Sequence, residues 1–203
     1  MHHQYQFFLL SCAYLSLGVF GLDTGRKALE EISSSTRVSL TYSAEINESI
    51  EKVWPKISHF DEIRLIDSSM ESSCLISKPF SSPEKGPDGS CLIHYTNDTP
   101  VGSIRDISFA DKHAYEQLVL SNPKTYQLSY RILSYPPSAK KYSPFPGSII
   151  DEQTDVTLSP LGAERTKVTW VASFFTDKPT AMNAAFHSIY ERAATGLQKL
   201  TRR

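Results

Sequence analysis

The chain contains 203 residues, of which 40% are hydrophobic and 21% are charged, and its formal net charge is −1. This length and composition correspond to one globular domain, with or without an appendage. The near-zero charge, without an extended cluster of Lys and Arg, argues against nucleic acid or an anionic membrane surface as a partner. Three cysteines, Cys12, Cys74 and Cys91, are too few for a disulfide scaffold or a four-cysteine zinc site.

The chain begins with an apolar, uncharged stretch over residues 7–22, which is shorter than the ~20 residues of a membrane-spanning helix. We therefore predict a signal peptide over residues 1–21, with Val19 and Gly21 as the small residues before the cleavage site. Cleavage implies export to the periplasm or secretion, a mature chain without a membrane span, and conditions in which Cys74 and Cys91 can pair. No Lys or Arg precedes the stretch, so a cytoplasmic or N-terminally anchored protein is the alternative.

Residues 22–36 are charged and serine-rich and are interpreted as a linker, so the domain is expected over residues 37–203. Residues 37–46 alternate between apolar and polar and predict a half-buried strand. Asn47 is a candidate N-cap for a helix with apolar residues at 50, 53, 54 and 57, which Pro55 interrupts or kinks. A second short helix is expected over residues 61–66.

A long loop rich in Ser, Pro and Gly follows, flanked by short apolar runs at residues 74–76 and 91–95. The pattern then predicts strands over residues 101–109, 115–120 and 126–133, a proline-rich loop over 135–147, and strands over 149–158 and 166–175. Residues 180–200 have one apolar stripe, which is typical of a helix packed against a sheet. The order of elements predicts an α+β fold in which a curved antiparallel sheet wraps around a long C-terminal helix.

The hairpin formed by residues 101–120 places two charges on an otherwise apolar face. With a turn at residues 111 and 112, Ile107 lies opposite Glu116 and Arg105 opposite Leu118. The shared face then contains Arg105, Ile107, Phe109, Ala114, Glu116, Leu118 and Leu120. Because buried charges are costly unless they are paired, Arg105 and Glu116 indicate an ion pair, a ligand site, or both.

The same residues resemble a known family. The segments Val101–Arg105, Glu116–Leu118 and Leu128–Ile132, together with Thr166–Trp170 and Val53–Trp54, resemble the signature of the SRPBCC superfamily of START and Bet v 1-like proteins, in particular its polyketide cyclase/dehydrase branch. The resemblance covers residues 37–201. It implies a helix-grip fold, with about seven antiparallel strands around the C-terminal helix, two short helices after the first strand, and a sizeable apolar cavity.

The resemblance implies a protein that binds or carries a hydrophobic small molecule, such as a lipid or a polyketide, in an internal cavity. The residues expected to line that cavity are Arg105, Ile107, Phe109, Glu116, Leu118, Tyr130, Ile132, Trp170, Phe186 and Ile189. The alternative is an enzyme of the cyclase, dehydratase or isomerase type, with Glu116 as acid or base and Arg105 stabilising an enolate. A tight turn over residues 110–113 argues against the longer gate loop of the hormone receptors in the superfamily.

No motif for a cofactor or a metal accompanies these residues. The sequence contains no phosphate-binding glycine loop and no redox pair of closely spaced cysteines. His59, His94, His113 and His187 are scattered without the spacing of metal ligands. We therefore expect neither a cofactor nor a metal.

Overall fold

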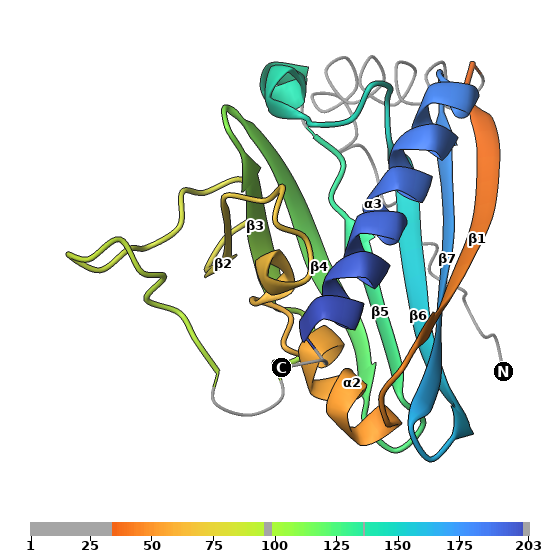
Figure 1. Ribbon diagram of the computed structural model, residues 1–203. Coiled ribbons are helices and arrows are strands. Elements are labelled where there is room, and N and C mark those ends of the chain that lie inside the picture. Colours follow the sequence, from red (N-terminus) through yellow and green to blue (C-terminus); the bar gives the residue numbers. More distant parts are fainter. Residues whose placement is uncertain (1–33, 96–98, 136, 201–203) are drawn as a thin grey trace, which may run out of the picture. The chain divides into compact units, whose positions relative to one another are not determined.

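The computed structural model describes residues 34–95, 99–135 and 137–200. Seven antiparallel strands form one sheet in the order β1-β7-β6-β5-β4-β3-β2, and the long helix α3 lies across one face of it (Figure 1). This arrangement confirms the predicted helix-grip fold. The strands are β1 (Thr36–Ile46), β2 (Ser72–Ile76), β3 (Ile104–Phe109), β4 (Lys112–Asn122), β5 (Gln127–Ile132), β6 (Ile150–Gly162) and β7 (Arg165–Thr176). The helices are α2 (Ile50–Ser58), α3 (Pro179–Leu200) and the 3-10 helices η1 (Ile63–Leu65) and η2 (Pro137–Tyr142).

The predicted N-cap of the first helix was wrong, and the predicted second helix is confirmed but shorter than expected. The N-cap of α2 is Ser49, without a side-chain cap bond, whereas the backbone N–H of Asn47 donates to Gln198 on α3 at 3.2 Å. Pro55 lies within α2 and does not end it. The second helix is one 3-10 turn, η1, none of whose side chains is fully buried.

The two apolar runs beside the long loop differ in structure. Residues 74–76 belong to β2, whereas residues 91–95 form no strand and an isolated bridge joins Cys91 to Lys85. Strand β3 begins at Ile104 rather than at residue 101 because the chain turns at Gly102, which has a φ of +94°. A positive φ of this kind is readily adopted by glycine.

The hairpin of β3 and β4 has a register two residues away from the predicted one. Arg105 lies directly opposite Glu116, and the turn occupies Ala110 and Asp111, with Ala110 at a φ of +54°. A shift of two residues keeps every side chain on its face, so both charges point inward as expected. Leu120 is the exception, because a bulge between Leu118 and Leu120 turns it outward and leaves it 39% exposed.

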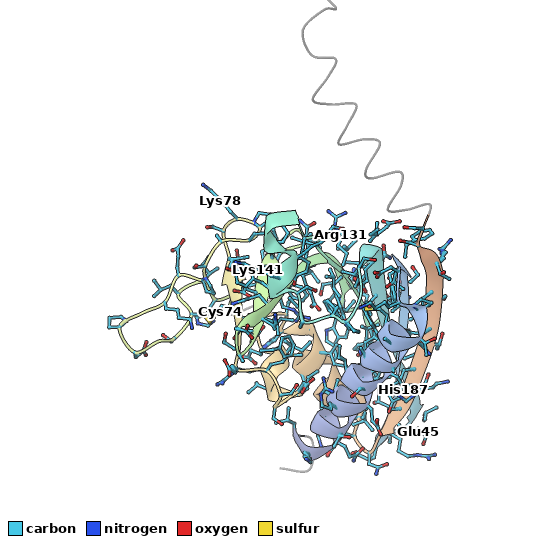
Figure 2. The ribbon with its side chains drawn as sticks, turned by 90° about the horizontal axis from the view of Figure 1, so that it is seen from above. Glu45, Cys74, Lys78, Arg131, Lys141 and His187 are labelled. Atoms are coloured by element: carbon cyan, nitrogen blue, oxygen red, sulfur yellow. A yellow bond between two sulfur atoms is a disulfide. The ribbon has the colours of Figure 1, made fainter. Side chains whose placement is uncertain are left out.

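The long connection from β2 to β3 covers part of the outer face of the sheet. Cys74, labelled in Figure 2, forms a disulfide with Cys91 and ties both ends of the intervening segment together. Within that segment, the Phe80 ring packs on the ring of Tyr115, with centroids 4.9 Å apart. The cover buries Asp106 on the outer face, where its carboxylate contacts Nδ1 of His113 at 2.8 Å.

The predicted signal peptide lies outside the described residues. Within the described part of the chain, no helix is long and apolar enough to cross a membrane.

The C-terminal half of α3 packs closely on the segment that follows η1. Gly196 makes this approach possible, because a Cβ at that position would come within 1.8 Å of the carbonyl oxygen of Ile66. The helix is therefore anchored at a point where only glycine fits.

Substitution Gly196→Ala is expected to lower the free energy of unfolding by about 1–3 kcal/mol, because the added methyl group overpacks this contact. Helix propensity alone would favour alanine by about 1 kcal/mol, so the sign of the effect is diagnostic. Urea unfolding of both forms measures it, and Thr195→Ala, at the exposed neighbouring position, is the control. A stabilising effect of Gly196→Ala would contradict the close contact.

Candidate ligand-binding site

A small cavity lies between the sheet and α3. Its volume is about 30 Å³, close to the space of one water molecule and far below the ~300–1,000 Å³ of drug-sized ligand sites. Its wall consists of Lys56, Ile57, Ile63, Ile66, Asp67, Met70, Arg105, Leu128, Tyr130, Val156, Trp170, Ile189, Tyr190 and Ala193. The expected cavity therefore exists in the expected place but is not sizeable.

Aromatic side chains fill the space that a larger cavity would occupy. Trp170 from β7 and Tyr190 from α3 stack with ring centroids 5.7 Å apart and an interplanar angle of 17°. The Phe186 ring packs on Phe174 at 4.6 Å and contacts Tyr190 at 6.0 Å. The core between helix and sheet is thus closely packed around a residual cavity.

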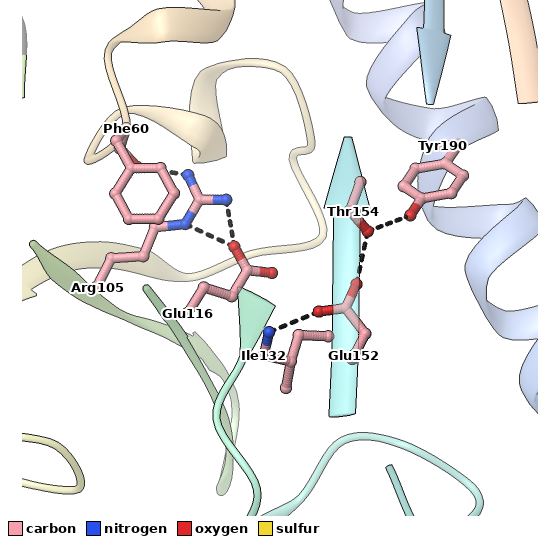
Figure 3. A network of polar contacts seen from close by, with 7 residues as sticks. All are labelled: Phe60, Arg105, Glu116, Ile132, Glu152, Thr154 and Tyr190. Carbon is pink, nitrogen blue, oxygen red and sulfur yellow. Dashed lines mark hydrogen bonds and ion pairs between the residues drawn. The ribbon is translucent and has the colours of Figure 1, made fainter. Parts of the chain in front are cut away.

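Arg105 and Glu116 form the predicted ion pair at the edge of this cavity (Figure 3). Nε of Arg105 donates to Oε2 of Glu116 at 2.8 Å, Nη2 donates to the same oxygen, and Nη1 donates to the carbonyl oxygen of Phe60. The guanidinium also lies over the Phe60 ring, 3.9 Å from its centroid. Every nitrogen of the guanidinium, which is 2% exposed, therefore has a partner within the protein.

A second buried carboxyl group, Glu152 on β6, lies close to this pair. Its Oε2 accepts the backbone N–H of Ile132 at 2.5 Å, and its Oε1 is 2.6 Å from the hydroxyl of Thr154. The Thr154 hydroxyl is in turn 2.9 Å from the hydroxyl of Tyr190 (Figure 3). Burial, to which the charge of Glu116 adds, raises the pKa of Glu152 to about 8, despite the opposing effect of the two hydrogen bonds. Glu152 therefore keeps its proton at neutral pH.

The structure distributes the ten predicted ligand residues over three environments. Four of them, Arg105, Tyr130, Trp170 and Ile189, line the cavity, and Glu116 adjoins it through Arg105. Leu118, Ile132 and Phe186 are buried in the main core without lining the cavity. Ile107 and Phe109 belong to a separate small cluster with Met70 and Ala114.

Sequence reasoning missed three polar residues of the site, Glu152, Thr154 and Tyr190. A signal for two of them was present, because Glu152 and Thr154 alternate in phase with Val156 and Leu158, which face the core. Tyr190 lies one turn after Phe186 on the apolar stripe of α3. Inward alternation is the same argument that identified Arg105 and Glu116.

Among the described residues, no group of three or more His, Cys, Asp or Glu side chains could hold a metal ion.

Comparisons with known proteins agree with the fold. No protein-family model matches the chain, and no curated protein matches it in sequence. Its fold is similar to those of an uncharacterized protein from Bacillus thuringiensis (TM-score 0.57, 20% identity, covering 82% of this chain and 100% of that one), of norcoclaurine synthase from Thalictrum flavum (0.56, 12%, 97% and 96%) and of a START superfamily protein from Mycobacterium smegmatis (0.53, 11%, 81% and 97%). The chain therefore has the helix-grip fold of START and Bet v 1-like proteins.

Substitution Arg105→Met is expected to destabilise the protein by about 3–5 kcal/mol, because it leaves the buried Glu116 carboxylate without its partner. The double variant Arg105→Met/Glu116→Leu should recover most of this loss, since it removes both charges together. Urea unfolding of the wild type, both single variants and the double variant gives the four free energies of a double-mutant cycle. Additive effects of the two single substitutions would contradict the pairing.

Substitution Glu152→Gln should change how stability depends on pH. Between about pH 4.5, the ordinary pKa of a glutamate, and about pH 8, the unfolded chain loses the Glu152 proton while the folded chain keeps it. The unfolding free energy of the wild type should therefore fall relative to that of Glu152→Gln by up to about 1.4 kcal/mol per pH unit across this window. Urea unfolding at several pH values measures the difference, and a difference independent of pH would contradict the raised pKa.

Proposed function

We propose that the chain binds or carries a hydrophobic small molecule, such as a lipid or a polyketide, between the sheet and α3. The observation that carries the proposal is the cavity itself, whose largely apolar wall contains a few convergent polar groups, as ligand sites usually do. The similar fold of norcoclaurine synthase, whose structure is a complex with dopamine and hydroxybenzaldehyde, supports a small-molecule site in this architecture.

Ligand entry requires the cavity to enlarge, and the short helix η1 is a part of its wall that can move. Ile63 of η1 lines the cavity, but η1 contributes no fully buried side chain. Moving η1 outward therefore costs little apolar burial, whereas Ile66 and Met70, which follow it, are buried and Ile66 packs on Gly196 of α3.

An ion pair holds the same segment against α3. The carboxylate of Asp67, 1% exposed, accepts hydrogen bonds from Nε of Arg192 at 3.1 and 3.2 Å and from the backbone N–H of Ser69 at 3.0 Å. Arg192 is partly exposed, so water can replace Asp67 as its partner when the segment moves. Entry of a ligand thus exchanges the Asp67–Arg192 contact for hydration.

The proposal includes export of the protein. A disulfide between Cys74 and Cys91 is typical of oxidising compartments and supports the signal peptide predicted over residues 1–21.

The experiment that tests the proposal uses N-phenyl-1-naphthylamine, an uncharged apolar dye whose fluorescence rises on binding. The wild type should bind it saturably, and Leu128→Ala, which enlarges the cavity, should tighten binding by about tenfold, or ~1.4 kcal/mol. Leu158→Ala removes the same atoms from a buried position outside the cavity wall and should not tighten binding. The proposal is wrong if the wild type does not bind the dye, or if both variants bind it equally.

A further inference from the structure

A continuous hydrogen-bonded chain runs from the end of β5 to the cavity. It begins at the backbone N–H of Ile132 and passes through the carboxyl group of Glu152 and the hydroxyl of Thr154 to the hydroxyl of Tyr190 (Figure 3). Glu152, Thr154 and Tyr190 are all at least 98% buried, so bulk water does not reach them. Tyr190 alone of the three contributes to the cavity wall.

The bonding pattern determines where each proton lies when Glu152 is protonated. Oε2 accepts the N–H of Ile132, and Oε1 accepts from the Thr154 hydroxyl at 2.6 Å when the carboxyl group is ionised. In the protonated acid, the proton lies on Oε1 and is donated to Thr154 instead. The single proton of the Thr154 hydroxyl is then free for a tyrosine oxygen, either that of Tyr190, 2.9 Å away, or that of Tyr130, which also hydrogen-bonds to Thr154. When Thr154 donates to Tyr190, the Tyr190 oxygen accepts and its own proton points away from Thr154.

We propose that Glu152, acting through Thr154, presents the hydroxyl proton of Tyr190 to the cavity, and that the site thereby selects apolar molecules that carry an uncharged oxygen acceptor, such as a ketone or an ester carbonyl. This inference rests on the proposed function, because it assigns the polar group of the ligand that the cavity accepts. Tyr190 and Thr154 are positioning and recognition groups and perform no chemistry on the ligand.

The other groups of the site favour an uncharged acceptor over a carboxylate. The nitrogens of Arg105 are already bonded to Glu116 and Phe60, so no cation is available to neutralise a ligand anion there. An anion would also meet the negative charge of Glu116 in an environment with little water. A neutral carbonyl avoids both costs and still accepts the Tyr190 proton.

Ionisation of Glu152 reverses the donor direction of the hydrogen bonds that link it to Thr154 and Tyr190. The carboxylate then accepts from Thr154, Thr154 accepts from Tyr190, and the cavity faces a hydroxyl that no longer offers its proton. Selection for a carbonyl should accordingly disappear as the pH rises past about 8. The titratable and charged groups around Glu152 are Glu116 on β4, Tyr130 on β5, Tyr190 on α3, Asp155 on β6 and, beyond Glu116, Arg105 on β3.

The test compares two probes of nearly equal shape, 2-acetylnaphthalene, which carries a carbonyl, and 2-ethylnaphthalene, which does not. Calorimetric titration of the wild type at pH 6.5 should show a preference of about tenfold for the acetyl compound, as expected for one buried hydrogen bond. At pH 9.5 this preference should be lost. Tyr190→Phe should abolish it at both pH values.

Substitutions of the hydrogen-bonded residues distinguish an effect of the Glu152–Thr154–Tyr190 network from a general change in core packing. In Glu152→Gln the amide oxygen can accept from Ile132 while the amide N–H donates to Thr154, so the variant should keep the preference at pH 9.5 as well. Thr154→Val should lose the preference and Thr154→Ser should retain it.

Each outcome decides a different claim. Equal binding of the two probes by the wild type at pH 6.5 overturns the inference and leaves the proposed function standing. A preference in Glu152→Gln that disappears between pH 6.5 and 9.5, as in the wild type, overturns the role of Glu152. Binding of neither probe by the wild type overturns the inference together with the proposed function.

Discussion

The inner face of the sheet holds two carboxyl groups, Glu116 and Glu152, where little water reaches them. Two buried anions this close together would be costly, and the surrounding structure removes the cost in two different ways. Glu116 is paired with Arg105, which also binds the carbonyl oxygen of Phe60 and so ties the segment after α2 to the sheet. Glu152 retains its proton and is held by Ile132 and Thr154. Different environments thus give two like groups different charges.

The different charges of Glu116 and Glu152 determine which polar groups lie at the small cavity. On one side, the charge of Arg105 is paired with that of Glu116, so the guanidinium shapes the wall without adding a net positive charge. On the other side, the hydrogen-bonded chain from Glu152 ends at Tyr190, a residue of the cavity wall. The remaining wall is largely apolar, and the ion pair of Asp67 and Arg192 holds one segment of it against α3. The result is a nearly filled core with a small, largely apolar cavity and a few polar groups in its wall.

Local sequence patterns predicted most of the fold and, of the polar groups at the site, the pair Arg105 and Glu116. Alternation in β1 and β3 and the apolar stripe of α3 are local signals, and they correctly placed Arg105 and Glu116 together on the inward face of the sheet. The hairpin register and the outward turn of Leu120 depend on a positive φ at Ala110 and on a β-bulge, which residue patterns do not specify. The network of Glu152 joins β5, β6 and α3, so it becomes visible only when the strands are placed beside the helix.

The central claim is that Glu152 remains protonated inside the folded protein at neutral pH. Carbon-13 NMR of the glutamate side-chain carboxyl groups measures this directly, with Glu152→Gln used to assign the resonance. The Glu152 carboxyl should titrate with a midpoint near pH 8. A midpoint near 4.5, the ordinary value for glutamate, would show that Glu152 is ionised at neutral pH and would contradict the account.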